Sequence, residues 1–282
     1  MKTVAIVGVG LIGGSFALAL RKAGFDGTIL GVSSDATLRA ALARGVIDRG
    51  APLEEAAHAA DLIYLAQPIG RIIDTLHHLD SALRPGSLVT DAGSTKGAIC
   101  ALAAKAIRAC QFLGGHPLAG KEKRGVAEAE ADLFAGRTYV LTPESGSELE
   151  TPAAREFLEW LRRMGARPLI IKPEDHDRVV AYTSHLAQLA STALAGTVAE
   201  CLHTDNELAI SGPGLADATR LALSSYDLWR DILATNAGAI DRALATYIQK
   251  LEQFRDNLRT RELQEEFEQA AWLAARLRGG KP

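Results

Sequence analysis

The chain begins with an apolar strand that runs directly into a Gly-x-Gly-x-x-Gly turn. Residues 4–7 are typical of a buried strand, and the apolar, proline-free stretch 11–23 predicts a helix. Between them, Gly8 permits a tight turn, Gly10 lets the backbone approach a pyrophosphate, and Gly13 lets the helix pack closely on the strand. We therefore predict a dinucleotide site rather than a plain glycine-rich turn, with contacts from Gly8, Gly10, Leu11, Ile12 and Gly13.

The second predicted strand, 28–32, bears on the choice of cofactor. NAD-binding turns of this kind usually place an acid about 20 residues on, at the end of that strand, where it binds the ribose 2′-hydroxyl. Here the position is Ser33, followed by Ser34 and Asp35, with Arg39 about one helical turn further. Loss of the carboxylate removes repulsion against a 2′-phosphate, and Arg39 adds positive charge, so we favour NADP over NAD. Asp35 as a ribose ligand, or Ser34 or Asp35 as a helix N-cap, are the alternatives.

Composition excludes several classes of protein. The 282 residues have a formal net charge of −3, which provides no basic footprint for nucleic acid or for a membrane surface. No apolar stretch approaches the ~20 residues of a membrane span, and the glycines interrupt the N-terminal apolar run, so we expect no secretory signal. The three cysteines lack metal-ligand spacing, which predicts reduced thiols in a cytoplasmic protein without a metal site.

The pattern of elements changes once along the chain. Strands alternate with helices up to about residue 172, which predicts an α/β domain of the Rossmann type with a parallel, doubly wound sheet over 1–172. From Pro173 onward the pattern is almost entirely helical, and we assign 173–282 to a substrate-binding and dimerisation domain. In its last part, apolar residues spaced by three and four form a seam on one long helix: Ile240, Leu244, Tyr247, Leu251, Phe254 and Leu258. Packing within the domain is the default for such a seam, but its length favours a homodimer.

Polar residues follow several predicted strands, at the sheet edge where ligands of doubly wound folds bind. Gln67 and Pro68 end one strand, Ser94 follows the next, and His116 ends another after two glycines. Imidazole has an ordinary pKa near 6.5, so His116 can accept a proton near neutral pH beside a departing hydride. We predict that His116 is catalytic rather than a hydrogen-bonded loop histidine, and that Gln67 and Pro68 contact the cofactor.

Three segments carry a resemblance to a known family. Residues 91–96 (DAGSTK), 114–120 (GGHPLAG) and 136–143 (GRTYVLTP) resemble the prephenate/arogenate dehydrogenases of tyrosine biosynthesis, as do 184–186, 219–222 and 228–232 in the helical part. The resemblance covers nearly the whole chain in order and spacing. It implies oxidative decarboxylation of a cyclohexadienyl substrate with NAD(P), a small-molecule substrate, and no nucleic-acid or membrane partner.

The resemblance also implies roles for individual residues. His116 accepts the hydrogen bond of the substrate hydroxyl, and Ser94 orients His116 and the nicotinamide. Arg220 clamps a carboxylate, while His185 and Trp229 lie on the substrate side. Lys96 serves Ser94 or a phosphate, or merely solvates the start of a helix.

The choice between prephenate and arogenate stays open. An acid beside the amine of arogenate would favour it, and Glu122 and Asp132 are the candidates; Glu122 alternatively pairs with Lys121 or Arg124. Ser33 in place of an acid leans toward arogenate by family association only. A β-hydroxyacid dehydrogenase is the nearest alternative, but residues 173–195 lack the lysine on which that chemistry depends. A silent NAD(P)-binding regulator would have lost His116 and Arg220.

Overall fold

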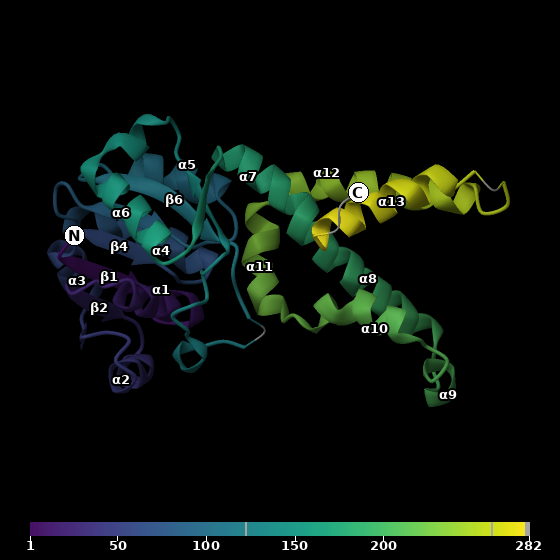
Figure 1. Ribbon diagram of the computed structural model, residues 1–282, viewed down its shortest axis with the longest axis horizontal. Helices are drawn as coiled ribbons and strands as arrows, with labels where there is room; N and C mark the ends of the chain where they lie inside the picture. Colours follow the sequence, from purple (N-terminus) through teal and green to yellow (C-terminus); the bar gives the residue numbers. More distant parts are fainter. Residues whose placement is uncertain (122, 261, 280–282) are drawn as a thin grey trace. The chain divides into compact units, whose positions relative to one another are not determined.

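The computed structural model describes residues 1–121, 123–260 and 262–279, and it divides the chain into two compact units. The first unit is Met1–Ala237 and the second is Gly238–Pro282. The first unit contains the whole sheet and the helices up to α11, labelled in Figure 1. Every residue discussed below as part of the site belongs to this unit.

The sheet of the first unit has eight strands in the order β3-β2-β1-β4-β5-β6-β7-β8. Parallel pairing runs from β3 through to β6, and β7 pairs parallel with β8. The strands are β1 (Thr3–Val7), β2 (Thr28–Val32), β3 (Arg49–Gly50), β4 (Leu62–Leu65), β5 (Leu88–Asp91), β6 (Gln111–Pro117), β7 (Thr138–Thr142) and β8 (Arg167–Ile170). The sequence pattern predicts all of these except β3, whose two residues are too short to show a period.

The sheet is mixed, whereas the sequence predicts a wholly parallel one. Strand β7 pairs antiparallel with β6, with Gly115 opposite Leu141 and His116 opposite Val140. A parallel connection needs a crossover that is usually a full helix. In the described part of 118–137 the chain forms only the short turn η2 (Val126–Glu128), so β7 returns beside β6 in the opposite direction.

Helices cover both faces of the sheet and enclose two apolar cores (Figure 1). One core lies under α1 (Leu11–Lys22) and α6 (Pro152–Arg163), where Phe16 stacks on Tyr64 with ring centroids 3.9 Å apart. The other core lies under α3 (Leu53–Ala59), α4 (Ile69–Leu79) and α5 (Gly97–Ala106). Helix α2 (Asp35–Ala43) follows β2.

After β8 the first unit continues as helices. These are α7 (Pro173–Val180), a π-helical turn (Ala181–His185), α8 (Leu186–Cys201), α9 (Asp205–Leu208), α10 (Pro213–Thr219), η5 (Arg220–Leu223) and α11 (Tyr226–Thr235). Helix α11 packs on the sheet domain, because Ile232 joins the core under α4 and Asp231 accepts a hydrogen bond from Gly70 N at 2.9 Å. The carboxylate of Asp231 thereby caps α4, whose own N-cap, Pro68, provides no side-chain bond.

The second unit is a pair of helices, α12 (Ala237–Asp256) and α13 (Gln264–Leu277). Phe254 lies against Phe267, and Lys250 pairs with Glu266, so the two helices run side by side. The predicted seam ends earlier than expected, because Leu258 lies beyond the end of α12 and is 73% exposed. No helix in the described parts of the chain is long and apolar enough to cross a membrane.

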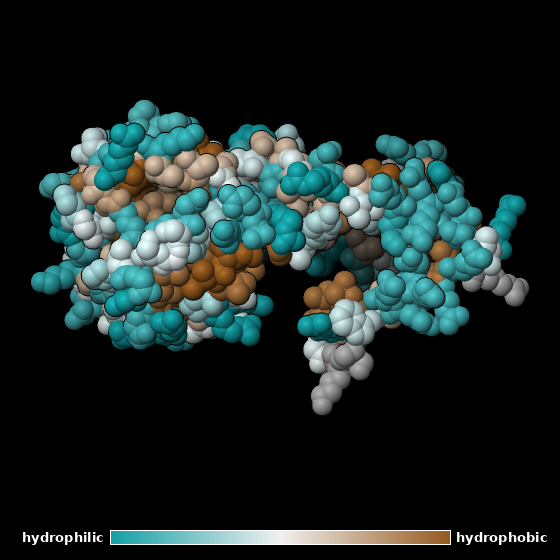
Figure 2. Space-filling model, turned by 90° about the horizontal axis from the view of Figure 1, so that it is seen from above, coloured by the Kyte–Doolittle hydropathy of each residue, from teal (hydrophilic) through white to brown (hydrophobic). Residues whose placement is uncertain are grey.

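Exposed large apolar side chains gather in the later part of the chain. Among the described residues, all of them except Leu42 and Leu118 lie at residue 169 or beyond. Figure 2 shows apolar areas breaking a mostly hydrophilic surface. Such areas mark surfaces that bind partners more often than they mark free surface.

Candidate active site

The glycine turn between β1 and α1 has the geometry of a dinucleotide cradle. Gly8 has a φ of +96°, and a Cβ placed there would lie 2.7 Å from the carbonyl oxygen of Ala66. A Cβ at Gly13 would overlap the carbonyl oxygen of Gly8, whereas one at Gly10 would meet no protein atom within 4 Å. The turn is therefore tight where strand and helix meet and open at Gly10. No side chain caps α1 at Gly10, so the first N–H groups of the helix, at Leu11 and Ile12, suit an anion.

A cavity of about 720 Å³ lies at the end of β2. Ser33, Asp35 and Arg39 line it, as the sequence predicts for the cofactor ribose, and Arg49 of β3 lines it as well. Arg49 also pairs with Glu55 at 2.5 Å. Ser34 does not line the cavity; its hydroxyl caps α2 by accepting from Thr37 N, as the N-cap alternative expects. Arg49 could not be predicted from the sequence, because β3 is only two residues long.

A third group of predicted cofactor contacts ends β4. The Gln67 backbone lies against the glycine turn, because a Cβ at Gly8 would be 2.9 Å from Gln67 N. The Gln67 side chain accepts a hydrogen bond from Thr75 at 2.8 Å, and Pro68 begins α4.

Another cavity, of about 530 Å³, is formed by β6, α7, the π-helical turn and α11. Four predicted site residues line it, namely Ser94, His116, His185 and Trp229. Arg220 does not line this cavity. Glu122 lies outside the described residues. Asp132, the other acid considered for an amine, is bound by Lys22 at 2.6 Å, and Lys121 pairs with Glu130.

His116 reaches this cavity because β6 has glycines at its centre. A Cβ at Gly115 would lie 2.6 Å from the carbonyl oxygen of Asp91 and 3.2 Å from the Tyr139 ring. The strand can therefore press against β5 while its next residue, His116, points into the cavity. Part of the His116 ring stays accessible there.

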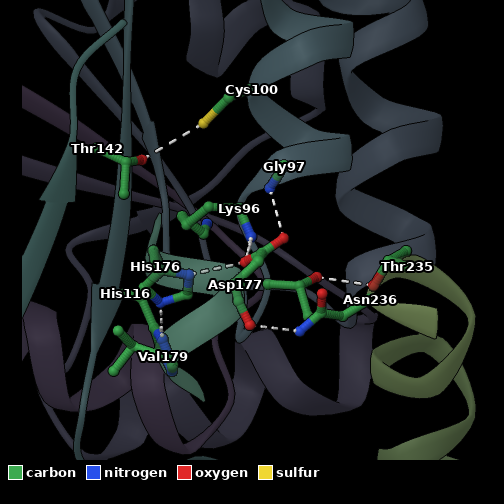
Figure 3. Close-up of polar contacts among 12 residues, drawn as sticks. Lys96, Gly97, Cys100, His116, Thr142, His176, Asp177, Val179, Thr235 and Asn236 are labelled. Carbon is green, nitrogen blue, oxygen red and sulfur yellow. Dashed lines mark hydrogen bonds and ion pairs between the residues drawn. The ribbon is translucent and has the colours of Figure 1, made fainter. Parts of the chain in front are cut away.

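The Nδ1 atom of His116 begins a chain of hydrogen bonds that the sequence did not predict (Figure 3). It lies 2.9 Å from Nε2 of His176, and Nδ1 of His176 lies 2.8 Å from Oδ1 of Asp177. The same carboxylate accepts from the backbone N–H groups of Lys96 at 2.7 Å and Gly97 at 2.8 Å. Asp177 thus caps α5, whose own N-cap has no side-chain bond. The sequence feature that could have indicated His176 and Asp177 is their position as a His-Asp dipeptide in the first turns of a helix that begins the predicted second domain.

Beneath this chain lies a buried ion pair. Lys96 and Asp91 are both fully buried and bonded to each other, and Asp91 also accepts from Gly93 N at 2.8 Å and Gly115 N at 3.1 Å. The expectation that Lys96 merely solvates a helix start is therefore wrong. Its ammonium neutralises the carboxylate that holds the strand carrying His116.

The π-helical turn brings His185 to the cavity. Residues 176, 179, 180 and 183 line it at ordinary helical spacing, and the wider turn adds Ser184 and His185. Nδ1 of His185 lies 3.2 Å from Nδ2 of Asn236, which donates to the carbonyl oxygen of Asp177 at 2.8 Å. Because an amide nitrogen only donates, His185 Nδ1 accepts, and the ring proton of neutral His185 is on Nε2. The His185 ring meets Trp229 edge to face.

Burial keeps the side chains of His116 and His185 neutral. It holds the pKa of His116 well below the usual 6.5, with smaller contributions from His176, Lys96 and His185. Burial also lowers the pKa of His185 to about 4, although Asp177 acts in the opposite direction. Burial acts to raise the pKa of Asp177, but the hydrogen bonds from His176, Lys96 and Gly97 outweigh it and lower that pKa. The site therefore holds neutral imidazoles at His116 and His185 near an ionised carboxylate at neutral pH.

The fold identifies the general class of protein to which the chain belongs. A glycine turn opening a mostly parallel sheet, with helices after the last strand, is that of Rossmann-type dinucleotide-binding proteins with a helical C-terminal region. Residues 16–169 match the family model "Prephenate dehydrogenase, nucleotide-binding domain", and 172–273 match "Prephenate dehydrogenase, dimerization domain". The chain belongs to the prephenate dehydrogenase family.

Individual relatives agree with this assignment. The chain is 34% identical over 241 residues to prephenate dehydrogenase of Lactococcus lactis, covering 84% of this chain and 65% of that protein. The chain therefore spans just under two thirds of that relative. A structure of Aquifex aeolicus prephenate dehydrogenase in complex with hydroxyphenyl propionate and NAD+ superposes with a TM-score of 0.85 at 29% identity, covering 99% and 98% of the two chains. Synechocystis arogenate dehydrogenase superposes at 0.82 with 30% identity, over 98% and 99%.

Among the described residues, no group of three or more histidines, cysteines or acids is placed to hold a metal ion. The three cysteines are unpaired, and Cys100 lies beside Thr142 (Figure 3).

Proposed function

We propose that this chain is an NAD(P)-dependent dehydrogenase that decarboxylates a cyclohexadienyl substrate, prephenate or arogenate. The observation that carries the proposal is His116: its Nδ1 is engaged by His176, while its ring is accessible from a cavity that Ser94 and His185 also line. Family membership and the open, uncapped glycine turn support the cofactor class.

The residues present fit the proposed chemistry. A bound nicotinamide would accept the hydride from the carbon that carries the substrate hydroxyl. His116 takes the hydroxyl proton as this C–H bond breaks, and returns it to the oxygen when loss of carbon dioxide makes the ring aromatic. Ser94 orients the hydroxyl, and the Nε2–H group of His185 donates to the substrate. No net proton is released, so the protein's task is alignment and a transient proton transfer.

Two predicted substrate-side residues are supported to different degrees. Trp229 lies against His185 in the cavity wall, which suits contact with an unsaturated ring. Arg220 stays a prediction as the carboxylate clamp, because it lies outside the lining of this cavity. Residues 1–172 would bind the nucleotide, and 173–282 would complete the substrate site and form a homodimer. The dimerization-domain match and the exposed apolar side chains beyond residue 169 support the dimer.

The experiment that tests the function is a steady-state comparison of four mixtures. Prephenate and arogenate are each assayed with NAD+ and with NADP+, following the reduced nicotinamide at 340 nm and the aromatic product by chromatography. We expect turnover with at least one of the two substrates and a higher kcat/KM with NADP+. No turnover in any mixture would contradict the function, and a strong preference for NAD+ would contradict only the role of Ser33.

The choice of NADP rests on two guanidinium groups. Arg39 and Arg49 line the cavity at the end of β2, where Ser33 stands in place of the acid that excludes a 2′-phosphate. Hydrogen bonds to charged groups contribute about 1.5–3 kcal/mol each. We therefore expect Arg39→Ala or Arg49→Ala to raise the dissociation constant of NADP+ by roughly 10–100-fold, measured by calorimetry.

The matched control is Arg44→Ala, which removes an arginine that follows α2 and bonds the carbonyl oxygen of Ala129 outside this cavity. It should leave NADP+ binding unchanged, and none of the three variants should weaken NAD+ binding by more than about twofold, because NAD+ lacks the 2′-phosphate. Equal losses for both cofactors would show that the two arginines support the fold rather than the phosphate.

A further inference from the structure

We infer that His176 and Asp177 are positioning residues that hold the ring proton of His116 on Nδ1, so that Nε2 is left as the acceptor facing the cavity. Neither residue was among the expected site residues. The role in turnover rests on the proposed function of His116, whereas the position of the proton does not.

The carboxylate of Asp177 has three hydrogen-bond partners. Its oxygens receive the backbone N–H groups of Lys96 at 2.7 Å and of Gly97 at 2.8 Å, which can only donate. An ionised carboxylate only accepts. The third partner, Nδ1 of His176 at 2.8 Å, must therefore donate as well.

The direction of donation in the next hydrogen bond follows from the imidazole rings of His176 and His116. In its singly protonated form, which the inferred chain of hydrogen bonds requires, His176 donates through Nδ1 and accepts through Nε2. That Nε2 lies 2.9 Å from Nδ1 of His116, which therefore donates. With its single proton on Nδ1, neutral His116 presents an unprotonated Nε2. That atom is the proton acceptor that the proposed reaction needs.

The surroundings hold this chain in place. Asp177 cannot turn away without leaving two N–H groups at the start of α5 unpaired, because Lys96 offers no cap of its own. Its backbone carbonyl is held by Asn236 at 2.8 Å, and His176 is only 2% exposed. The titratable groups around the rings are Lys96, whose charge is neutralised by Asp91, and His185, a neutral ring that accepts from Asn236.

The test measures directly which ring nitrogen of His116 carries the proton. The protein, labelled with 15N-histidine and saturated with NADP+, is examined at neutral pH by two-bond 1H–15N NMR correlation, and His116 is assigned by loss of its signals in His116→Asn. We expect Nδ1 of His116 to be protonated and Nε2 to have the shift of an unprotonated nitrogen. A proton on Nε2 in the wild-type protein would overturn the inference, even if the enzyme is active.

Two substitutions separate positioning from folding. His176→Leu removes the acceptor, and we expect the Nε2–H form of His116 to become populated and kcat to fall on the order of 10²-fold, with the KM for cofactor within about twofold. His176→Gln offers Oε1 near the place of Nε2 and should restore the Nδ1–H form and most of the lost kcat. The inference is overturned if His176→Leu leaves both tautomer and kcat unchanged, or if His176→Gln is as impaired as His176→Leu while its melting temperature matches the wild type. If no substrate is turned over, the tautomer measurements still decide.

Discussion

His116→Asn is expected to lower kcat by roughly 10²–10⁴-fold, the range typical of losing a positioned general base. This corresponds to about 3–5 kcal/mol of transition-state stabilisation, at 1.36 kcal/mol for each factor of ten. Asparagine keeps an N–H group near the place of Nδ1 and so preserves the bond to His176. It has no atom at the place of Nε2, and the substrate hydroxyl loses its acceptor.

Binding of the cofactor should be unaffected, because His116 lies outside the glycine turn and outside the cavity at the end of β2. The matched control is His58→Asn, at an exposed histidine on α3, which should leave every parameter unchanged. Turnover within a few-fold of wild type in His116→Asn would remove His116 from its proposed role.

The pH dependence of the wild type offers a second measurement of the same residue. His116 works only when neutral, and burial holds its pKa well below the usual 6.5. Turnover should therefore stay level as the pH falls through 6.5 and decline only at more acidic values.

Lys96→Met is expected to lower the free energy of unfolding by about 3–5 kcal/mol, since it leaves a buried carboxylate without its partner. Both side chains are fully buried, so the ammonium of Lys96 and the carboxylate of Asp91 are paired away from solvent. Asp91 also receives Gly93 N and Gly115 N, so the loss would loosen the contact between β5 and the strand that carries His116. Urea unfolding followed by circular dichroism measures the change.

The double variant Lys96→Met/Asp91→Asn should recover part of this loss, because it removes the charge that is left uncompensated. Lys105→Met is the matched control, since Lys105 is an exposed lysine on the same helix, and it should change stability by less than about 0.5 kcal/mol. If Lys96→Met proves no more destabilising than Lys105→Met, the pair is not a structural element of the site.

The sheet and its helices follow from local patterns. Residues 28–32 form β2 as predicted, and α1 follows the predicted helix 11–23 to within one residue, because apolar periodicity reports which face of an element is buried. The antiparallel direction of β7 could not be predicted from local patterns. It depends on how residues 118–137 return to the sheet edge, and no local period encodes that path.

The residues of the candidate site likewise fall into those that the sequence predicted and those that it did not. Ser94 and His116 follow strand ends and were predicted by their place in the fold, whereas His176, Asp177 and Arg49 were not. His176 and Asp177 bond residues far along the chain, and Asp177 caps a helix that begins 80 residues earlier. Arg49 belongs to a strand that is too short to be recognised.

By itself the amino-acid sequence determined the glycine cradle, the order of strands and helices, and the family. Each of these depends on residues close together in the chain, whose spacing is readable. Only the tertiary structure decided which groups surround His116, that Lys96 is a buried counter-ion, and that a helix after the last strand supplies the imidazole beside His116. The hydrogen bonds from Lys96 N to Asp177, at 2.7 Å, and between His116 and His176, at 2.9 Å, join residues far apart in the chain and form only once packing has brought the elements together.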